Sequence, residues 1–188
     1  SMSNDSKLGI SDASFASDIS HDSQELDTCI ALYKAQLEQG EIQKAYHYLL
    51  RYLMHLKAHL SGSMSTEFSF GNISPGYMDF SYFPFFDQYL SARKLRFGIV
   101  LNHKALRFEL WLMGQNAMVQ NTFWRKLKSS PWNAGRTEMP QYSILETVLV
   151  ETPNFKQTDQ LTLKIKAEAM RAAAAITEAI RTAEGHDN

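Results

Sequence analysis

The sequence has a single cysteine, Cys29, among its 188 residues. One thiol excludes an intrachain disulfide framework and a cysteine-rich metal site, and it favours a reducing compartment, so we expect a cytoplasmic protein. No apolar run approaches the roughly 18 residues of a membrane span. Residues 1–24 lack the apolar stretch of a secretory signal. We therefore expect no membrane partner.

Established catalytic signatures are also missing. The sequence contains no GxSxG, P-loop, GxGxxG or HExxH pattern. We expect no cofactor, and whether the protein is an enzyme stays open. The net charge of −1 gives no global attraction for polyanions.

The N-terminal region is poor in large apolar residues and rich in serine. Ser1 before Met2 is typical of a cloning remnant, and eight serines lie within residues 1–24, which we predict to be a flexible tail. If this tail is ordered, a neighbouring subunit is a candidate to hold it. We predict one α+β domain over residues 25–184.

Apolar periodicity predicts the elements of this domain. A stripe at helical spacing runs through residues 25–61, and Gly40 interrupts it, which indicates an N-terminal helical hairpin. Residues 67–113 then alternate as strands, with Tyr77–Phe83 as one of them and Pro84 ending it or lying at an edge. We predict a four-stranded antiparallel meander, then a helix over 115–128, a strand over 144–150 and a last helix from Thr158 or Asp159 to about Ala183.

The hairpin over residues 94–113 has the strongest alternation in the chain. A two-residue loop at His103-Lys104 places apolar residues opposite one another, although that loop lacks the usual Asn-Gly turn and can be one or two residues longer. The predicted pairs on the apolar face are Leu101–Leu106, Ile99–Phe108, Phe97–Leu110 and Leu95–Leu112. Those on the other face are Arg96–Trp111, Gly98–Glu109 and Val100–Arg107.

That second face carries the candidate polar site. If Met78, Phe80 and Tyr82 face the core, five side chains share one side of the sheet: Asp79, Arg96, Arg107, Glu109 and Trp111. Two carboxylates near two guanidiniums are the minimum for a divalent metal and a phosphate. The competing interpretation, which we favour, is a cross-strand ladder in which the arginines pair with Glu109 and Arg96 stacks on Trp111.

The order of elements resembles the PD-(D/E)XK nuclease superfamily. That resemblance implies Asp79 as the metal aspartate and Glu109 as the acid of E-x-K. The third residue of this triplet is Trp111 instead of lysine. Arginine cannot readily release a proton, so neither Arg96 nor Arg107 replaces that lysine chemically.

Charge is partitioned along the chain despite the small net value. Residues 93–128 carry eight basic side chains and one acidic one, whereas residues 1–30 carry one basic and six acidic ones. The basic block predicts weak binding of an anion or nucleic acid, and the alternative is a solvated surface balanced by the acidic tail. The anion-binding candidates are Lys94, Lys104, Arg125 and Lys126. Nine aromatic residues lie within residues 68–89, mostly as expected core, with Tyr77, Tyr82 and Phe86 left open as candidates to stack on bases.

Other reactive residue types have a simpler interpretation. His55 and His59 have the i, i+4 spacing of a zinc pair, but they lie opposite the leucine stripe without a third ligand, so we predict no metal site. Cys29 falls within the first apolar stripe and is predicted to be buried.

One run is similar to a family of small, uncharacterised bacterial proteins. The residues that carry the resemblance follow the pattern G-N-I, G-Y-M-D and R-F-E-x-W-L-x-G-x-N, which begin at Gly71, Gly76 and Arg107. The resemblance runs from about Leu26 to the final helix and implies no activity. We therefore predict a non-enzymatic binding or interaction module, with a phosphate-bearing ligand and a second copy of the chain as open partners. The alternative is a metal-dependent phosphoester hydrolase or a degenerate nuclease-like domain.

Overall fold

The computed structural model describes residues 23–186. The chain divides into two compact units with the boundary between Met54 and His55. Each unit is considered by itself. The predicted tail, residues 1–24, lies outside the described residues except for Ser23 and Gln24, which begin a helix. The α+β class is confirmed, and the single domain over 25–184 stays a prediction.

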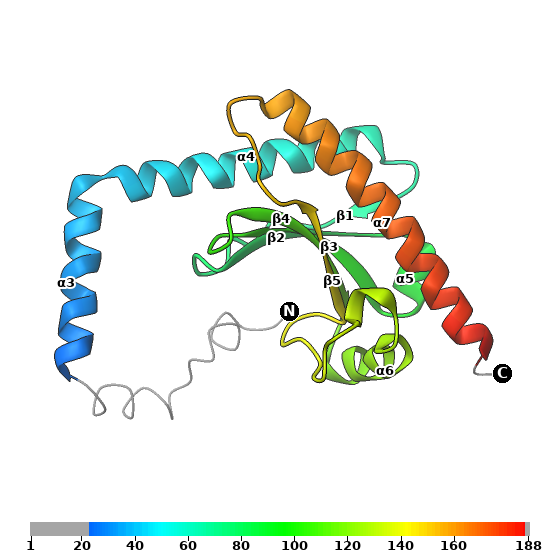
Figure 1. Ribbon diagram of the computed structural model, residues 1–188. Coiled ribbons are helices and arrows are strands. Elements are labelled where there is room, and N and C mark those ends of the chain that lie inside the picture. The colour runs from blue at the N-terminus through cyan, green and yellow to red at the C-terminus, as the bar shows by residue number, and fades with distance from the viewer. Residues whose placement is uncertain (1–22, 187–188) are drawn as a thin grey trace. The chain divides into compact units, whose positions relative to one another are not determined.

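The first unit contains α3 (Ser23–Gln39) and the start of α4 (Glu41–Ser63) (Figure 1). Gly40 separates the two helices, as predicted, and adopts a left-handed φ of 82°. The predicted burial of the first helix is wrong, because none of the described residues Ser23–Gln39 is buried. Cys29 is accordingly exposed.

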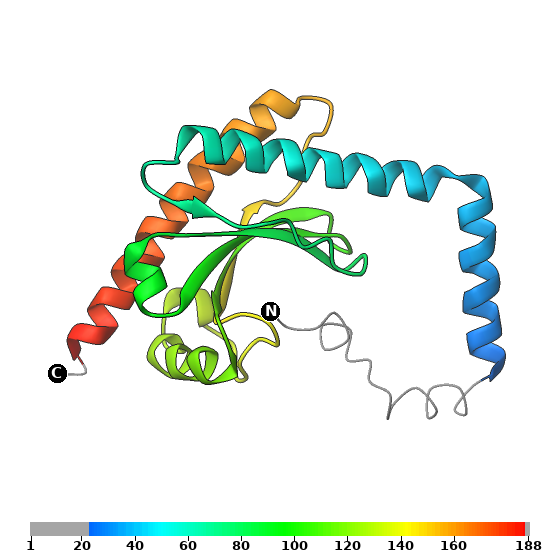
Figure 2. The ribbon, with the colours of Figure 1, turned by 180° about the vertical axis from the view of Figure 1, so that it is seen from behind.

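The second unit is built on a sheet whose strands follow the chain order. They are β1 (Ser69–Phe70), β2 (Phe80–Phe86), β3 (Leu95–Asn102), β4 (Arg107–Gly114) and β5 (Leu145–Val150). Each pairs antiparallel with the next, so the described residues form a five-stranded meander (Figures 1 and 2). The strand predicted over residues 144–150 therefore extends the meander from four strands to five.

The β3–β4 hairpin has the predicted faces but a different register. Leu101 pairs with Phe108 and Ile99 with Leu110, so the predicted pairs are shifted by two residues. The connection is the four residues 103–106, in which Leu106 has a left-handed φ of 51° and is exposed. A shift of two preserves which side chains share a face, because strand side chains alternate with a period of two.

Strand β2 starts three residues later than predicted. Met78 adopts a φ of 63°, and the Asp79 carboxylate accepts the backbone N–H of Tyr77 and of Phe80, so residues 75–79 form a turn. Pro84 lies inside the strand. Its carbonyl accepts the Gly71 N–H on the side away from β3, so its missing N–H lies on the outer side and breaks no bond to β3.

Helices cover the apolar face of the sheet. Helix α7 (Thr158–His186) packs on β4 and β5, and in Figures 1 and 2 it lies over the sheet beside the last turns of α4. Its buried residues recur every three or four positions, as a helix facing a core requires. The apolar ones are Leu161, Ile165, Ala169, Ala173, Ile176 and Ile180, and Thr162 is buried next to Leu161.

Short helices complete the unit at the sheet ends. Helix α6 (Ala117–Leu127) begins with a side-chain cap, since Asn116 Oδ1 accepts the Val119 N–H at 3.0 Å. Phe123 is buried, whereas Met118 is exposed. Helix α5 (Gln88–Ala92) follows β2, and the 3₁₀ turn η1 (Pro131–Asn133) follows α6.

Candidate functional site

Glu109 is the centre of the polar face of the sheet. It lies in β4 on the face away from α7 and is only 2% exposed. Its Oε2 accepts hydrogen bonds from Asn102 Nδ2 at 2.9 Å and from Arg107 Nε at 2.7 Å. Its Oε1 accepts one from Trp111 Nε1 at 2.8 Å. Both oxygens are therefore engaged by neighbouring side chains.

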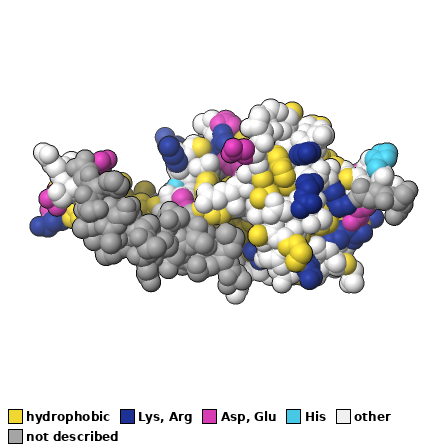
Figure 3. Space-filling model, turned by 90° about the horizontal axis from the view of Figure 1, so that it is seen from below, with side chains coloured by type: hydrophobic (Ala, Val, Ile, Leu, Met, Phe, Trp, Pro, Cys, Tyr) yellow, Lys and Arg dark blue, Asp and Glu magenta, His cyan; other side chains and the backbone are white. Residues whose placement is uncertain are grey.

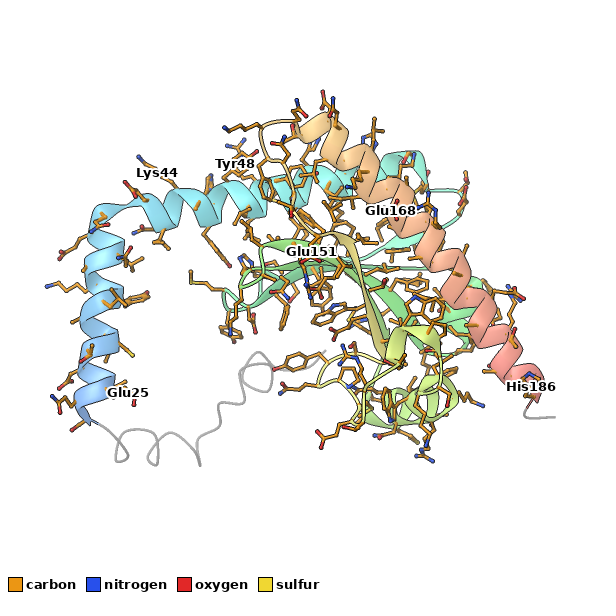
Figure 4. All side chains as sticks on the ribbon, in the orientation of Figure 1. Glu25, Lys44, Tyr48, Glu151, Glu168 and His186 are labelled. Atoms are coloured by element: carbon orange, nitrogen blue, oxygen red, sulfur yellow. The ribbon has the colours of Figure 1, made fainter. Side chains whose placement is uncertain are left out.

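Arg107 links this buried carboxylate to the surface. Its Nη1 lies 3.2 Å from Oε1 of Glu151, which lies just beyond β5 (Figure 4). The hydrogen bond to Glu109 is the main reason that the pKa of Arg107 is raised. The arginine is thus held as a cation between one buried and one exposed carboxylate.

Glu146 is a second carboxylate on this face, and the sequence interpretation missed it. It sits in β5 opposite Trp111. Burial raises the pKa of Glu146 above its ordinary value, and the charge of Glu109 adds to that rise. The hydroxyl of Ser143, at 2.7 Å, and Arg136, at 3.5 Å, act in the opposite direction. The signal that could have identified Glu146 is the alternation along residues 145–150, in which Leu145 and Leu149 face the core and Glu146 faces the other side.

An aromatic cluster covers the centre of the polar face. Val100, Trp111 and Met113 are buried together, and Phe80, Tyr82 and Tyr142 pack against them. The rings of Phe80 and Trp111 meet edge-on with centroids 4.8 Å apart. This apolar cover shields Trp111, which in turn holds one oxygen of Glu109.

The structure does not bring Asp79 to Glu109. Asp79 caps the turn before β2 through the Tyr77 and Phe80 amides. Its charge acts instead on Tyr142 and His103: it adds to the burial that raises the pKa of Tyr142, and it opposes the burial that lowers the pKa of His103. The predicted orientation of Phe80 toward the core is wrong, because its ring meets Trp111 on the polar face. The contacts of Asp79 give no support to a face shared with Glu109, because its carboxylate binds its own turn.

Arg96 also lies away from the carboxylate. It pairs with Met113 in the register and not with Trp111 as predicted. Its Nε is buried and finds no acceptor among the described residues. The ladder on this face is therefore built by Arg107, Glu109 and Trp111, without Arg96.

A serine–histidine contact appears at the end of the sheet. Ser81 Oγ lies 2.8 Å from His103 Nε2 and also donates to the Pro75 carbonyl. Ser81 is completely buried, and its only proton is committed to a backbone oxygen. Burial lowers the pKa of His103. The pair joins the turns before β2 and after β3, and it is not an accessible nucleophile with its base.

Two of the anion-binding candidates, Lys94 and Lys104, lie at opposite ends of β3. Lys94 precedes β3 and Lys104 follows it, so the strand length of about 26 Å separates them. Arg125 and Lys126 lie in the last turn of α6. Figure 3 shows Lys and Arg side chains spread between hydrophobic ones on the face seen from below.

Another basic residue of the block, Arg93, is held within the fold. Its Nε lies 2.9 Å from both oxygens of Glu184. Its guanidinium also stacks over the Tyr89 ring at 3.6 Å. Arg93 therefore ties α5 to the end of α7 and adds little to a free cationic surface.

His55 and His59 are both exposed, as predicted for the side of α4 opposite the leucine stripe. Within residues 23–186, no three His, Cys, Asp or Glu side chains lie close enough to hold a metal ion. Over the same range, no helix combines the length and the apolar character that crossing a membrane needs.

Residues 26–180 match a family described as a domain of unknown function, DUF7000. The chain belongs to this family. The predicted membership of an uncharacterised family is confirmed. No curated protein and no solved structure matches the chain. The matched range includes α3 from Leu26 onward and every residue of the polar face described above.

Proposed function

We propose that this member of DUF7000 is a non-enzymatic interaction module that binds its partner through α3. The observation that carries the proposal is the exposure of that helix: none of its described residues is buried, although it presents a row of large apolar side chains. The family match begins at the first residue of this row, Leu26, so the helix is part of the family domain.

The row has the spacing of a helix that docks on another surface. Leu26, Ile30 and Tyr33 are 38%, 57% and 64% exposed, and they follow one another at four and three residues. Side chains at this spacing lie on one side of a helix, which is the usual recognition surface of helical partners. In Figure 4 side chains project from α3 on all sides, with Glu25 labelled near its start.

The polar face gives less support to the alternative, a metal-dependent phosphoester hydrolase. Such an enzyme needs carboxylate oxygens that are free to bind a metal ion. Glu109 has both oxygens engaged by protein donors, and Asp79 binds its own turn. The ladder of Arg107, Glu109 and Trp111 is therefore better explained as a stabilising feature of the sheet than as a metal site.

A cytoplasmic location is part of the same proposal. It is supported by the exposed thiol of Cys29, since an exposed single thiol is best preserved in a reducing compartment. Weak anion binding by Lys94, Lys104, Arg125 or Lys126 is a secondary proposal, and its test is given below.

The test replaces the apolar row in the full chain by Leu26→Ser, Ile30→Ser and Tyr33→Ser together. A docking surface contributes nothing to the folded monomer, so the melting temperature measured in dilute solution is expected to stay within about 2 °C of wild type. The control is Leu56→Ala in α4, whose fully buried side chain predicts a loss of about 2–5 kcal/mol. A triple variant that melts as early as this control would show that the row is core and would overturn the proposal.

A further inference from the structure

We propose that the partner of α3 is α3 of a second copy of this chain, packed against it in antiparallel orientation. This inference rests on the proposed function, and it names the occupant of the same surface. It is carried by the apolar spacing of α3 and by the charges on the two flanks of its apolar row.

The apolar row follows the alternating spacing of a two-helix coiled coil. Leu26, Ile30, Tyr33 and Leu37 are separated by four, three and four residues, which is the d–a–d–a order of a heptad. In an antiparallel pair, Leu26 packs against the partner's Leu37, and Ile30 packs against the partner's Tyr33. Twofold symmetry repeats each contact, so four layers form along the roughly 17 Å of helix between Leu26 and Leu37.

The two flanks of the row differ in charge. Asp27 and Lys34 lie on one flank, whereas Cys29 and Gln36 lie on the other. In an antiparallel pair each flank meets its own copy, so Asp27 faces the partner's Lys34 and Lys34 faces the partner's Asp27. Opposite charges across an interface select orientation and register.

A parallel pair does not have this complementarity. There the charged flank meets the opposite flank of the second helix, so Lys34 faces the partner's Cys29. Among residues 23–186, the ion pair of Lys34 is an exposed contact with Glu38 at 3.7 Å. A contact of this kind is weak, and it leaves the lysine available to a second acid.

The size of the contact predicts a weak dimer. Two helices of 17 residues bury less than the roughly 1,200 Å² of a standard stable interface, so association is expected to depend on concentration. A helix of this length is only marginally stable by itself. Pairing stabilises it and therefore also slows the exchange of its backbone amides.

The experiment is sedimentation velocity of the full chain over a wide concentration range, with charge variants. Asp27→Lys or Lys34→Asp alone places like charges opposite each other twice, and each variant is expected to weaken dimerisation about tenfold. The exchanged variant, Asp27→Lys with Lys34→Asp, restores opposite charges and is expected to recover dimerisation. Far-UV circular dichroism checks that α3 stays helical. An exchanged variant no better than the single ones would overturn the antiparallel pairing.

Thiol cross-linking provides a second, independent measurement. The antiparallel register places residue 36 beside the partner's Cys29, so Gln36→Cys is expected to give a covalent dimer with a short bismaleimide. Gln39→Cys, on the far side of the helix, is the matched control and is expected to give no covalent dimer, although the chain still pairs. Lys34→Cys tests the parallel arrangement, in which residue 34 lies beside the partner's Cys29. A high yield of covalent dimer from this variant alone would overturn the proposal.

The outcomes separate this inference from the proposed function. A chain that stays monomeric at every concentration, with a triple Ser variant that keeps its melting temperature, overturns self-pairing alone. A triple variant that loses stability overturns both.

Discussion

Burying a carboxylate as deeply as Glu109 is costly unless donors replace the water that it has lost. Arg107, Trp111 and Asn102 replace that water through three hydrogen bonds. The three donors come from the same hairpin, so both carboxylate oxygens have partners as soon as β3 and β4 pair. The stability of the polar face therefore depends on the pairing of β3 with β4, which supplies the hydrogen bonds of Glu109.

Glu109→Gln keeps the shape of the side chain but removes its charge. We expect a loss of about 2 kcal/mol in the free energy of unfolding, because hydrogen bonds to a charged group are the stronger ones. Urea denaturation measures it. Glu151→Gln removes the exposed partner of the same arginine and is expected to lose less than about 0.5 kcal/mol. Equal losses in the two variants would contradict this role for Glu109.

Glu146 predicts a pH dependence of stability. Its pKa is raised in the folded protein, mainly by burial, so between the ordinary and the raised value the folded state holds a proton that the unfolded chain has released. Stability is therefore lost as the pH rises through this window. Glu146→Gln remains neutral, and its stability relative to wild type is expected to increase from about pH 4 to neutral pH. Urea unfolding across this range measures the difference, and a difference that falls with pH would refute the assignment.

At the scale of elements, alternation in the sequence predicted the face of the sheet on which a side chain lies better than it predicted the residue opposite on the neighbouring strand. Ile99 and Leu110 are both buried on the face where alternation placed them, and they pair with each other. The predicted partners differed because a shift of two residues leaves every face unchanged. The left-handed Leu106 in the connection set the shift, and its conformation has no reliable signal in the sequence.

The candidate site was predicted in part for the same reason. Arg107, Glu109 and Trp111 lie on one strand at a spacing of two, so their shared face follows from alternation alone. Asp79 and Arg96 depend on pairing between strands, and neither reaches Glu109. Glu146 needed the pairing of β5 with β4, which joins segments more than thirty residues apart.

Helix α7 offers a test of close packing at this scale. Ala173 is 3% exposed and lies in the buried row of the helix, whereas the adjacent Ala174 is exposed. Ala173→Leu inserts three carbons into a packed contact, and we expect a loss of about 1–3 kcal/mol. Ala174→Leu makes the same chemical change at the surface and is expected to lie within about 0.5 kcal/mol of wild type. Thermal unfolding compares the two, and similar effects would show that the helix does not pack through this row.

For the whole molecule, the position of charges matters more than their number. Lys94 and Lys104 are about 26 Å apart along β3, or roughly three Debye lengths at physiological salt. Their fields are therefore independent, and a block of charge in the sequence becomes separate sites in space. This separation weakens the case for one strong polyanion surface.

Labelled oligonucleotides test that conclusion. We expect weak binding at low salt that disappears at physiological salt, because few phosphates are contacted at once. Lys104→Glu and Arg125→Glu are each expected to reduce it slightly, with additive effects, because the two sites are independent. Fluorescence anisotropy at two salt concentrations measures this. Tight binding that either variant alone abolishes would show a single joined surface.

Gly40 makes the chain bend where a rod would otherwise form. A methyl group at this position would meet no atom within 4 Å, so only its left-handed φ favours glycine. Alanine there is strained by roughly 1–2 kcal/mol, and it favours continuing the helix. Gly40→Ala would thus shift the chain toward one helix from Ser23 to Ser63, about 60 Å long. The length of the helix that carries the apolar row therefore depends on the absence of one methyl group.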